Sequence, residues 1–265
     1  MVEIFQYGFM QRALMAGVII GILCPTIGIF LVLRRMSMIG NSLSHVALSG
    51  VAAGIVMGIY PLAMALIFSV AAALGIEQLR KMYSEYAELA MAVILSAGLG
   101  VAVVLISYAK SINIDLFGYL FGNILTVRPE DMWLIAALGF FIIAFVGLNF
   151  RELFYIAFDE ESARIAGIPV KRVNLLFTVL IAMTITLSMR IVGALLVSSL
   201  MVIPVATGIQ LAKSFRHATL LSVIAAETAV ISGIILSYYL ELASGGTIVL
   251  LSVTFLMLVL GLKKL

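Results

Sequence analysis

Residues 30–53 read FLVLRRMSMIGNSLSHVALSGVAA, in which one apolar run ends at an arginine pair and a second uncharged run begins. Outward from that pair, Arg34 and Arg35, no Asp, Glu, Lys or Arg occurs back to Arg12 or forward to Glu77. A helix needs about 20 apolar residues to cross the hydrocarbon core of a bilayer. The first interval therefore predicts one membrane-spanning helix. The second is about twice as long and is divided by a Tyr-Pro pair, so it predicts two.

The same alternation of long uncharged runs and short charged clusters continues along the whole chain. Hydrophobic residues make up 64% of the sequence and charged residues 11%, against about 45–50% and about 25% in a soluble domain. This composition excludes a soluble globule and a disordered chain, and the single cysteine, Cys24, excludes a disulfide scaffold. Continuous rather than alternating apolar runs disfavour a β-barrel. The sequence predicts an all-α polytopic membrane protein, with one transmembrane domain over residues 1–265.

Nine apolar segments are expected, at residues 9–33, 43–59, 61–79, 88–109, 131–149, 173–189, 191–211, 218–240 and 245–262. The second is short and glycine-rich, so eight full spans and one partial span is the alternative. Lys and Arg gather at cytoplasmic span ends. Nine crossings place twelve basic residues inside and only Lys110, Arg128 and Arg190 in outer loops, with Arg12 near the outer end of the first span. The N-terminus is therefore expected outside and the C-terminus in the cytoplasm. The bilayer is the partner that this pattern implies, and a net charge of +3 does not indicate a nucleic acid.

Two loops are long enough to have a function of their own. Residues 110–130 are expected outside, and their apolar stretch from Leu116 to Leu125 is too short to span a membrane. It is either a re-entrant or interfacial helix or a connector on the surface. Residues 151–172 are expected in the cytoplasm and are the most charged part of the chain.

The cytoplasmic loop has the pattern of a short capped helix. Asp159 is placed to cap its N-terminus, and Glu160 and Glu161 fall in the first turn, where the helix dipole favours anions. Gly167 fits the end of the helix, and Pro169 follows it. By composition alone, such a helix is a solvated connector between two spans.

The segment after the arginine pair carries polar groups on one face of a predicted helix. At about 100° per residue, that face holds Asn41, Ser42, His45 and Ser49, and the opposite face holds Gly50, Gly54 and Gly58. Glycines four residues apart let another helix approach closely. Lipid is a costly neighbour for an imidazole, so the polar face is expected along a water-filled pathway. Asn41 and His45 are spaced to meet one divalent metal ion. The alternative is that His45 hydrogen-bonds a neighbouring helix and binds nothing.

Four stretches of the chain together resemble a known family. FLVLRRMSMIGNSLSHVALSGVA, FDEESARIAGIPV, RIVGALLVSSLMVIPVATG and SYYLELASGGTIVL are similar to the ABC-transporter permeases for zinc, manganese and iron uptake, the ZnuB type. In the loop, Glu161-Ser-Ala-Arg-Ile-Ala-Gly167 resembles the E-A-A-x-x-x-G coupling pattern, with Ala163 at its third position.

The resemblance implies a fold like that of the vitamin B12 and siderophore permeases. It also implies a homodimer, a dimer of cytoplasmic ATPase subunits bound at the 151–172 loops, and an extracytoplasmic metal-binding protein that docks outside. The residue four before the histidine is commonly Asp in the family, and the pair is thought to meet the metal. Here that residue is Asn41, which removes a negative charge and is expected to weaken cation binding.

Four other residues in or near the apolar runs carry individual expectations. Glu227, inside a span, is either part of the pathway or hydrogen-bonded to a Ser or Thr of a neighbouring span. Glu241 is expected at the outer mouth. Arg190, between two apolar runs, is expected to extend outward to water. Pro204 is expected to kink its helix.

The sequence thus predicts a permease subunit in a bacterial inner membrane that imports a divalent transition metal, zinc first, then manganese or iron. No cofactor is expected to be permanently bound. The chain contains no G-x-x-x-x-G-K-[ST], so ATP hydrolysis is expected on a separate subunit. It also lacks H-E-x-x-H and G-x-S-x-G, so no enzyme is expected. The alternative function is a secondary transporter or channel without an ATPase partner.

Overall fold

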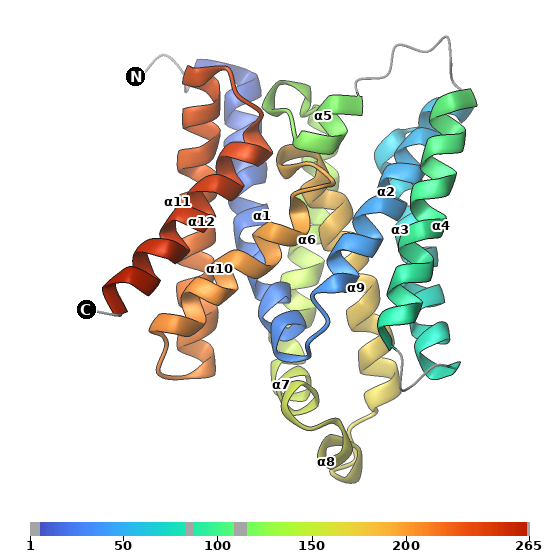
Figure 1. The fold of residues 1–265 in the computed structure, drawn as a ribbon, viewed down its shortest axis with the longest axis vertical. Helices are drawn as coiled ribbons and strands as arrows, with labels where there is room; N and C mark the ends of the chain where they lie inside the picture. The colour runs from blue at the N-terminus through green and yellow to red at the C-terminus, as the bar shows by residue number, and fades with distance from the viewer. Residues whose placement is uncertain (1–5, 83–86, 109–115, 264–265) are drawn as a thin grey trace.

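The computed structural model describes residues 6–82, 87–108 and 116–263, and these residues form a helical bundle without strands (Figure 1). The longer helices are α1 (Gly8–Leu33), α2 (Met38–Met57), α3 (Pro61–Met82), α4 (Ala87–Tyr108), α6 (Pro129–Leu148), α9 (Val170–Val192), α10 (Val197–Leu211), α11 (Phe215–Leu240) and α12 (Ser244–Lys263). The shorter ones are α5 (Leu116–Phe121), the 3₁₀ helix η2 (Ile124–Thr126), α7 (Phe150–Phe158) and α8 (Glu160–Ile165). Lys110, Lys264 and the first part of the 110–130 loop lie outside the described residues.

Eight of the helices in the described ranges are long and apolar enough to cross a membrane. The prediction of eight or nine spans is confirmed, but the partial span is not where the sequence placed it. α2 begins at Met38 rather than at residue 43 and has the length of a full span. The short apolar helix is α10, with 15 residues.

The boundary between α9 and α10 explains this correction. A break was expected at Arg190, but α9 continues to Val192. It ends at Gly193, whose φ of 86° lies in the left-handed region that favours glycine. α10 starts only at Val197 and contains Pro204.

α1 and α9 form the centre of the bundle, and most of their residues are buried. Their core side chains include Ile20 and Phe30 of α1 and Phe177 and Ile181 of α9. α10 comes so close to α1 that a Cβ at Gly28 would lie 2.0 Å from the carbonyl oxygen of Met201. By contrast, α4, α6 and α12 are largely exposed and apolar, as expected of helices that face lipid.

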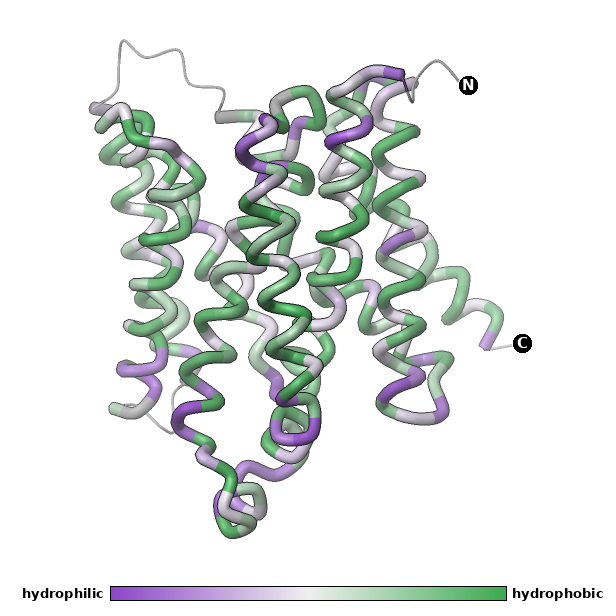
Figure 2. Tube along the Cα trace, turned by 180° about the vertical axis from the view of Figure 1, so that it is seen from behind, coloured by the Kyte–Doolittle hydropathy of each residue, from purple (hydrophilic) through white to green (hydrophobic). Residues whose placement is uncertain are grey.

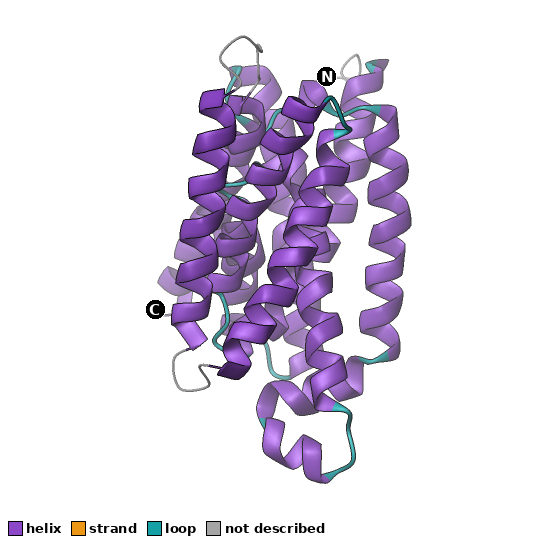
Figure 3. Ribbon diagram, turned by 90° about the vertical axis from the view of Figure 1, so that its right-hand side faces the viewer, coloured by secondary structure: helices purple, strands orange, loops and turns teal. Residues whose placement is uncertain are grey.

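The two ends of the bundle differ (Figures 1 and 3). α7 and α8 project beyond one end, while the start of α1, α5 and the turn between α11 and α12 lie at the other. Figure 2 shows an apolar middle and hydrophilic segments toward the ends, including the α7–α8 hairpin. The short α5 and η2 confirm that the Leu116–Leu125 stretch does not span the bundle.

Candidate functional site

The polar face of α2 is divided between a helix contact and an open surface. The Ser42 hydroxyl donates to the carbonyl oxygen of Met91 at 2.9 Å, and that of Ser49 to the carbonyl oxygen of Gly98 at 2.5 Å, both on α4. Both serines are buried. Asn41 and His45 are only partly buried, so they are the two members of the predicted face that keep accessible surface.

The glycine face of α2 packs as predicted at two of its three positions. A Cβ at Gly50 would lie 2.5 Å from Cα of Ala65, and one at Gly54 would lie 2.8 Å from Cα of Pro61, so α3 lies directly against this face. Gly58 does not take part, because α2 ends at Met57 and Gly58 caps it with a φ of 68°. The contacts with α3 and α4 therefore fix which way Asn41 and His45 point.

No cluster of three or more His, Cys, Asp or Glu side chains able to hold a metal occurs within the described ranges. Asn41 and His45 offer one amide oxygen and one imidazole nitrogen, fewer than the four ligands typical of a permanent zinc site. Asn41 and His45 by themselves therefore do not make a permanent zinc site.

Glu227 lies elsewhere, at the interface of α11 with α1. A Cβ at Gly21 would lie 2.7 Å from its Oε1, and this buried oxygen has no hydrogen-bond partner among the described residues. Figure 1 places α11 and α2 on opposite sides of the bundle. The structure therefore does not bring Glu227 together with Asn41 and His45.

The predicted capped helix is α8. The Asp159 carboxylate accepts the amide hydrogens of Glu161 and Ser162, both at 3.0 Å. The Ser162 hydroxyl also donates to it, and these bonds hold the pKa of Asp159 below its usual range. Glu160 and Glu161 occupy the first turn as expected.

The end of α8 is also as the sequence predicted. Gly167 follows the C-cap residue Ala166 with a φ of 85°, and the Ile168 amide donates to the carbonyl oxygen of Ala163 at 3.1 Å. Ala163 is the buried residue of α8, and its other residues are exposed. The sequence did not predict α7, whose Phe154 contacts Phe215 at the start of α11, with ring centroids 4.9 Å apart. α8 is thus a polar, solvent-exposed helix, and the preceding helix α7 packs against the bundle through aromatic side chains.

The expectation for Arg190 is wrong. Its side chain is 6% exposed, and its Nε lies 3.4 Å from Oδ2 of the fully buried Asp131. Its guanidinium lies 4.7 Å from the ring centroid of Tyr119, and the Tyr60 hydroxyl donates to Asp131. Burial and this hydrogen bond raise the pKa of Tyr60. The carboxylate of Asp131 compensates the charge of Arg190 inside the bundle, so the side chain does not extend to water.

This ion pair has only a weak signal in the amino-acid sequence. Asp131 stands at the start of one apolar run and Arg190 near the end of another, and nothing in their spacing links them. The structure joins them because α6 begins, and α9 ends, at the same end of the bundle.

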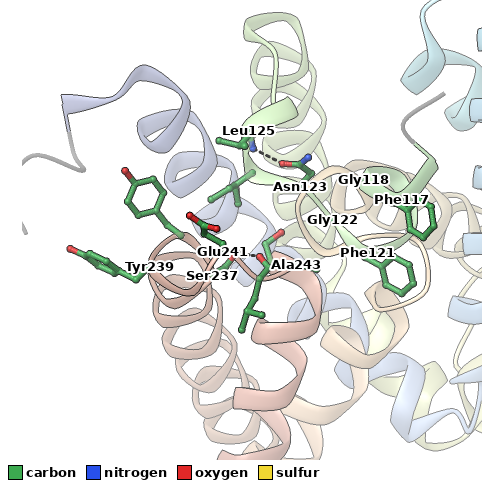
Figure 4. Close-up of a pocket in the computed structure, with 14 residues that line it drawn as sticks. Phe117, Gly118, Phe121, Gly122, Asn123, Leu125, Ser237, Tyr239, Glu241 and Ala243 are labelled. Carbon is green, nitrogen blue, oxygen red and sulfur yellow. Dashed lines mark hydrogen bonds between the residues drawn. The ribbon is translucent and has the colours of Figure 1, made fainter. Parts of the chain in front are cut away.

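A cavity of about 800 Å³ opens at that same end (Figure 4). α5, the residues that follow it and the turn between α11 and α12 form its wall, with Phe117, Asn123, Tyr239 and Glu241 among the lining residues. Glu241 has a φ of 53°, in the left-handed region. The placement expected for Glu241, at the mouth opposite the charged loop, agrees with this geometry.

These features define a polytopic membrane protein: eight helices of membrane-spanning length among the described residues, a short helix pair beyond one end and a cavity at the other. Residues 6–263 match the ABC 3 transport family, and the chain belongs to it.

Relatives cover nearly the whole chain. It is 40% identical over 265 residues to the "Probable metal transport system membrane protein" of Treponema pallidum (strain Nichols), covering 98% of this chain and 97% of that protein. It is 33% identical over 249 residues to the "Manganese transport system membrane protein MntC" of Listeria innocua, covering 94% and 89%.

A solved structure shares the fold. The structure "PsaBC from Streptococcus pneumoniae in complex with Fab" superposes with a TM-score of 0.86 and 31% identity, covering 97% of this chain and 93% of that one. A "putative metal-chelate type ABC transporter" in an inward-facing conformation has a TM-score of 0.69 at 14% identity, and that likeness concerns the fold alone. The predicted family and fold are confirmed.

Proposed function

We propose that this chain is the membrane subunit of an ATP-driven importer that moves a divalent transition metal ion into a bacterial cell. The observation that carries the proposal is α8, a capped, exposed polar helix held beyond one end of an apolar bundle. Its exposed charged residues offer a contact surface to a soluble subunit, which a plain connector between two spans does not need. Membership of the ABC 3 transport family supports this reading.

The end that carries α8 is proposed to face the cytoplasm, where ATP is available. This places the start of α1 outside and the C-terminus inside. A dimer of separate ATPase subunits binds the α7–α8 hairpins of two copies of the chain, since the chain itself has no phosphate-binding loop motif. An extracytoplasmic metal-binding protein delivers the ion at the opposite end, where the cavity beside Glu241 opens.

Manganese is proposed as the first metal to test. The sequence put zinc first, but the relatives from Listeria and from Streptococcus parasanguinis are named for manganese transport and import. Oxygen ligands suit manganese better than soft ligands do, and Asn41 supplies one. Zinc and iron are the competitors in the assay.

Asn41 and His45 are proposed to meet the ion during transport, with a second copy completing the ligand set. They lie one helical turn apart on α2 and keep accessible surface. Ser42 and Ser49 are proposed to fix the direction of this pair through their bonds to α4. Glu227 is not proposed as a ligand, because α11 lies on the other side of the bundle.

The metal assignment is tested by uptake of labelled manganese into liposomes that hold the permease and its ATPase subunit. His45→Ala should lower uptake by at least about tenfold, equivalent to about 1.4 kcal/mol, while the ATPase stays bound. Ser44→Ala is the matched control on α2, because the hydrogen bond of its hydroxyl among the described residues stays within the helix, to the carbonyl oxygen of Gly40. Full uptake by the His45 variant would refute the assignment.

The coupling assignment is tested in the same preparation. Glu161→Lys reverses a charge in the first turn of α8 and should abolish ATP-dependent uptake or release the ATPase. Glu88→Lys makes the same change on an exposed residue of α4 and should leave both intact. Uptake that proceeds without ATP, or a chain that never retains an ATPase, would replace the proposal with a secondary transporter or channel.

A further inference from the structure

Arg34, the first residue after α1, contacts both α8 and α9, the two helices on either side of the turn at Gly167. Its side chain is 7% exposed, and Nη2 donates to Oδ1 of Asn174 on α9 at 2.9 Å. The same nitrogen lies 3.9 Å from Oε2 of Glu160, the first residue of α8. The guanidinium also lies 5.8 Å from the ring centroid of Phe177. One buried cation thus joins α1, α8 and α9.

α8 has few other attachments to the bundle. Ala163 is its buried residue, and the second ion pair of Glu160, to Arg164 at 3.6 Å, stays within the helix. Glu160 itself is 44% exposed, and its 3.9 Å separation from Arg34 leaves room for the pair to tighten or to open. A displacement of α8 therefore reaches the bundle through Ala163 and through Arg34.

Arg34 is also joined rigidly to α2. The next residue, Arg35, has a φ of 55°, unusual for a residue other than glycine. The Met36 amide donates to the carbonyl oxygen of Leu31 at 2.9 Å, and the Ile39 amide donates to the carbonyl oxygen of Met36 at 3.0 Å. These hydrogen bonds hold the turn between α1 and α2. α2 then begins at Met38, and Asn41 and His45 fall within its first eight residues.

We propose that Arg34 is the positioning residue that transmits movement of α8 to the start of α2. The inference rests on the proposed function, in which an ATPase displaces α8. When α8 moves, the Glu160 carboxylate changes its distance to the guanidinium while Asn174 still holds Arg34 to α9. The turn then re-aims α2, and with it Asn41 and His45. Arg34 in this way links metal access to the state of the ATPase, beside the packing contact of Ala163.

The test measures metal uptake and ATP hydrolysis together, on the permease with its ATPase subunit in liposomes. Glu160→Ala and Arg34→Lys should lower the number of manganese ions taken up per ATP by at least about fivefold, the lower end of typical couplings between sites. The KM for manganese and the bound ATPase should not change. The double variant should be no worse than either single variant. Lys213→Ala, which removes an exposed cation at the same end, is the matched control.

The result separates this inference from the proposed function. Unchanged uptake per ATP in Glu160→Ala would overturn the role of Arg34 and leave the importer intact. If the Arg34→Lys variant does not accumulate in the membrane, the uptake per ATP of the Glu160→Ala variant is the deciding measurement, because Glu160 is exposed. A native assembly that takes up no metal, or holds no ATPase, would overturn the proposed function and this inference with it.

Discussion

Two arginines, at opposite ends of the bundle, are equally buried but differ in their partners. Arg190 is paired with Asp131, which is fully buried on α6. Arg34 is paired with Glu160, which is 44% exposed on the projecting helix α8. The first pair is sealed on both sides by protein, whereas the second has one side in water.

The difference separates a structural ion pair from a movable one. Removing one partner of a buried pair leaves an uncompensated charge, which costs about 3–5 kcal/mol. Glu160 is re-solvated when it leaves, and Arg34 keeps its hydrogen bond to Asn174, so separation of this pair should cost less. Only the pair at the α8 end can open and close during a transport cycle.

The largest expected effect is at the pair of Arg190 and Asp131. Asp131→Asn should lower the free energy of unfolding by about 3–5 kcal/mol, because Arg190 then stays buried without a counter-charge. Thermal unfolding in detergent and abundance in the membrane measure this loss. Its neighbour Glu130 is exposed, so Glu130→Gln is the control. The double variant Asp131→Leu with Arg190→Met should recover part of the loss. An Asp131→Asn variant with the stability of the native chain would contradict the interpretation of this pair as a buried structural ion pair.

A smaller effect is expected where backbones meet at the same end. A Cβ at Gly245 would lie 1.8 Å from the carbonyl oxygen of Val192, so Gly245→Ala must push α12 away from α9. Overpacking of this kind costs about 1–3 kcal/mol. A Cβ at Gly246 would have no atom within 4 Å, so Gly246→Ala should have the same unfolding temperature as the native chain. Equal unfolding temperatures for the two variants would show that the contact is not tight.

The pair of Arg34 and Glu160 should have less influence on stability. Glu160→Gln should lower the free energy of unfolding by less than Asp131→Asn does, because the 44% exposed Glu160 lies 3.9 Å from Arg34 and Asn174 still accepts a hydrogen bond from the guanidinium. Chemical denaturation of the native chain and the two variants checks this order. A loss as large as that of Asp131→Asn would place both pairs in the same structural class and would argue against a movable link.

The smallest expected effect is local and depends on pH. Asp159→Ala should speed hydrogen exchange at the amides of Glu161 and Ser162, which the carboxylate caps. The Ser162 hydroxyl lowers the folded-state pKa of Asp159, so its stabilising effect is complete above the unfolded value of about 3.9 and is lost as the pH falls through the folded value. The difference between native chain and variant should therefore vanish in acid. Glu161→Gln keeps the cap and is the control.

Much of the fold was predictable, because charge-free runs of membrane length report spans directly. The capped helix at Asp159 to Gly167 was also predictable, since caps depend on neighbouring residues alone. The division of the α2 face was not. The helical periodicity places four polar residues on one face without distinguishing them: Asn41, Ser42, His45 and Ser49. Only the position of α4 determines that the two serines are covered.

The sequence by itself determined the class of fold, the capped helix and the residues eligible to meet a metal, because apolar periodicity and local hydrogen bonding are written in consecutive residues. Tertiary structure decided which charges meet. Arg190 finds Asp131, 59 positions earlier, and Arg34 finds Glu160, 126 positions later. Such pairs depend on where whole helices end relative to one another. The exposure of the carboxylate then decides how strongly each pair is held, because water screens the charge of Glu160 but not that of Asp131.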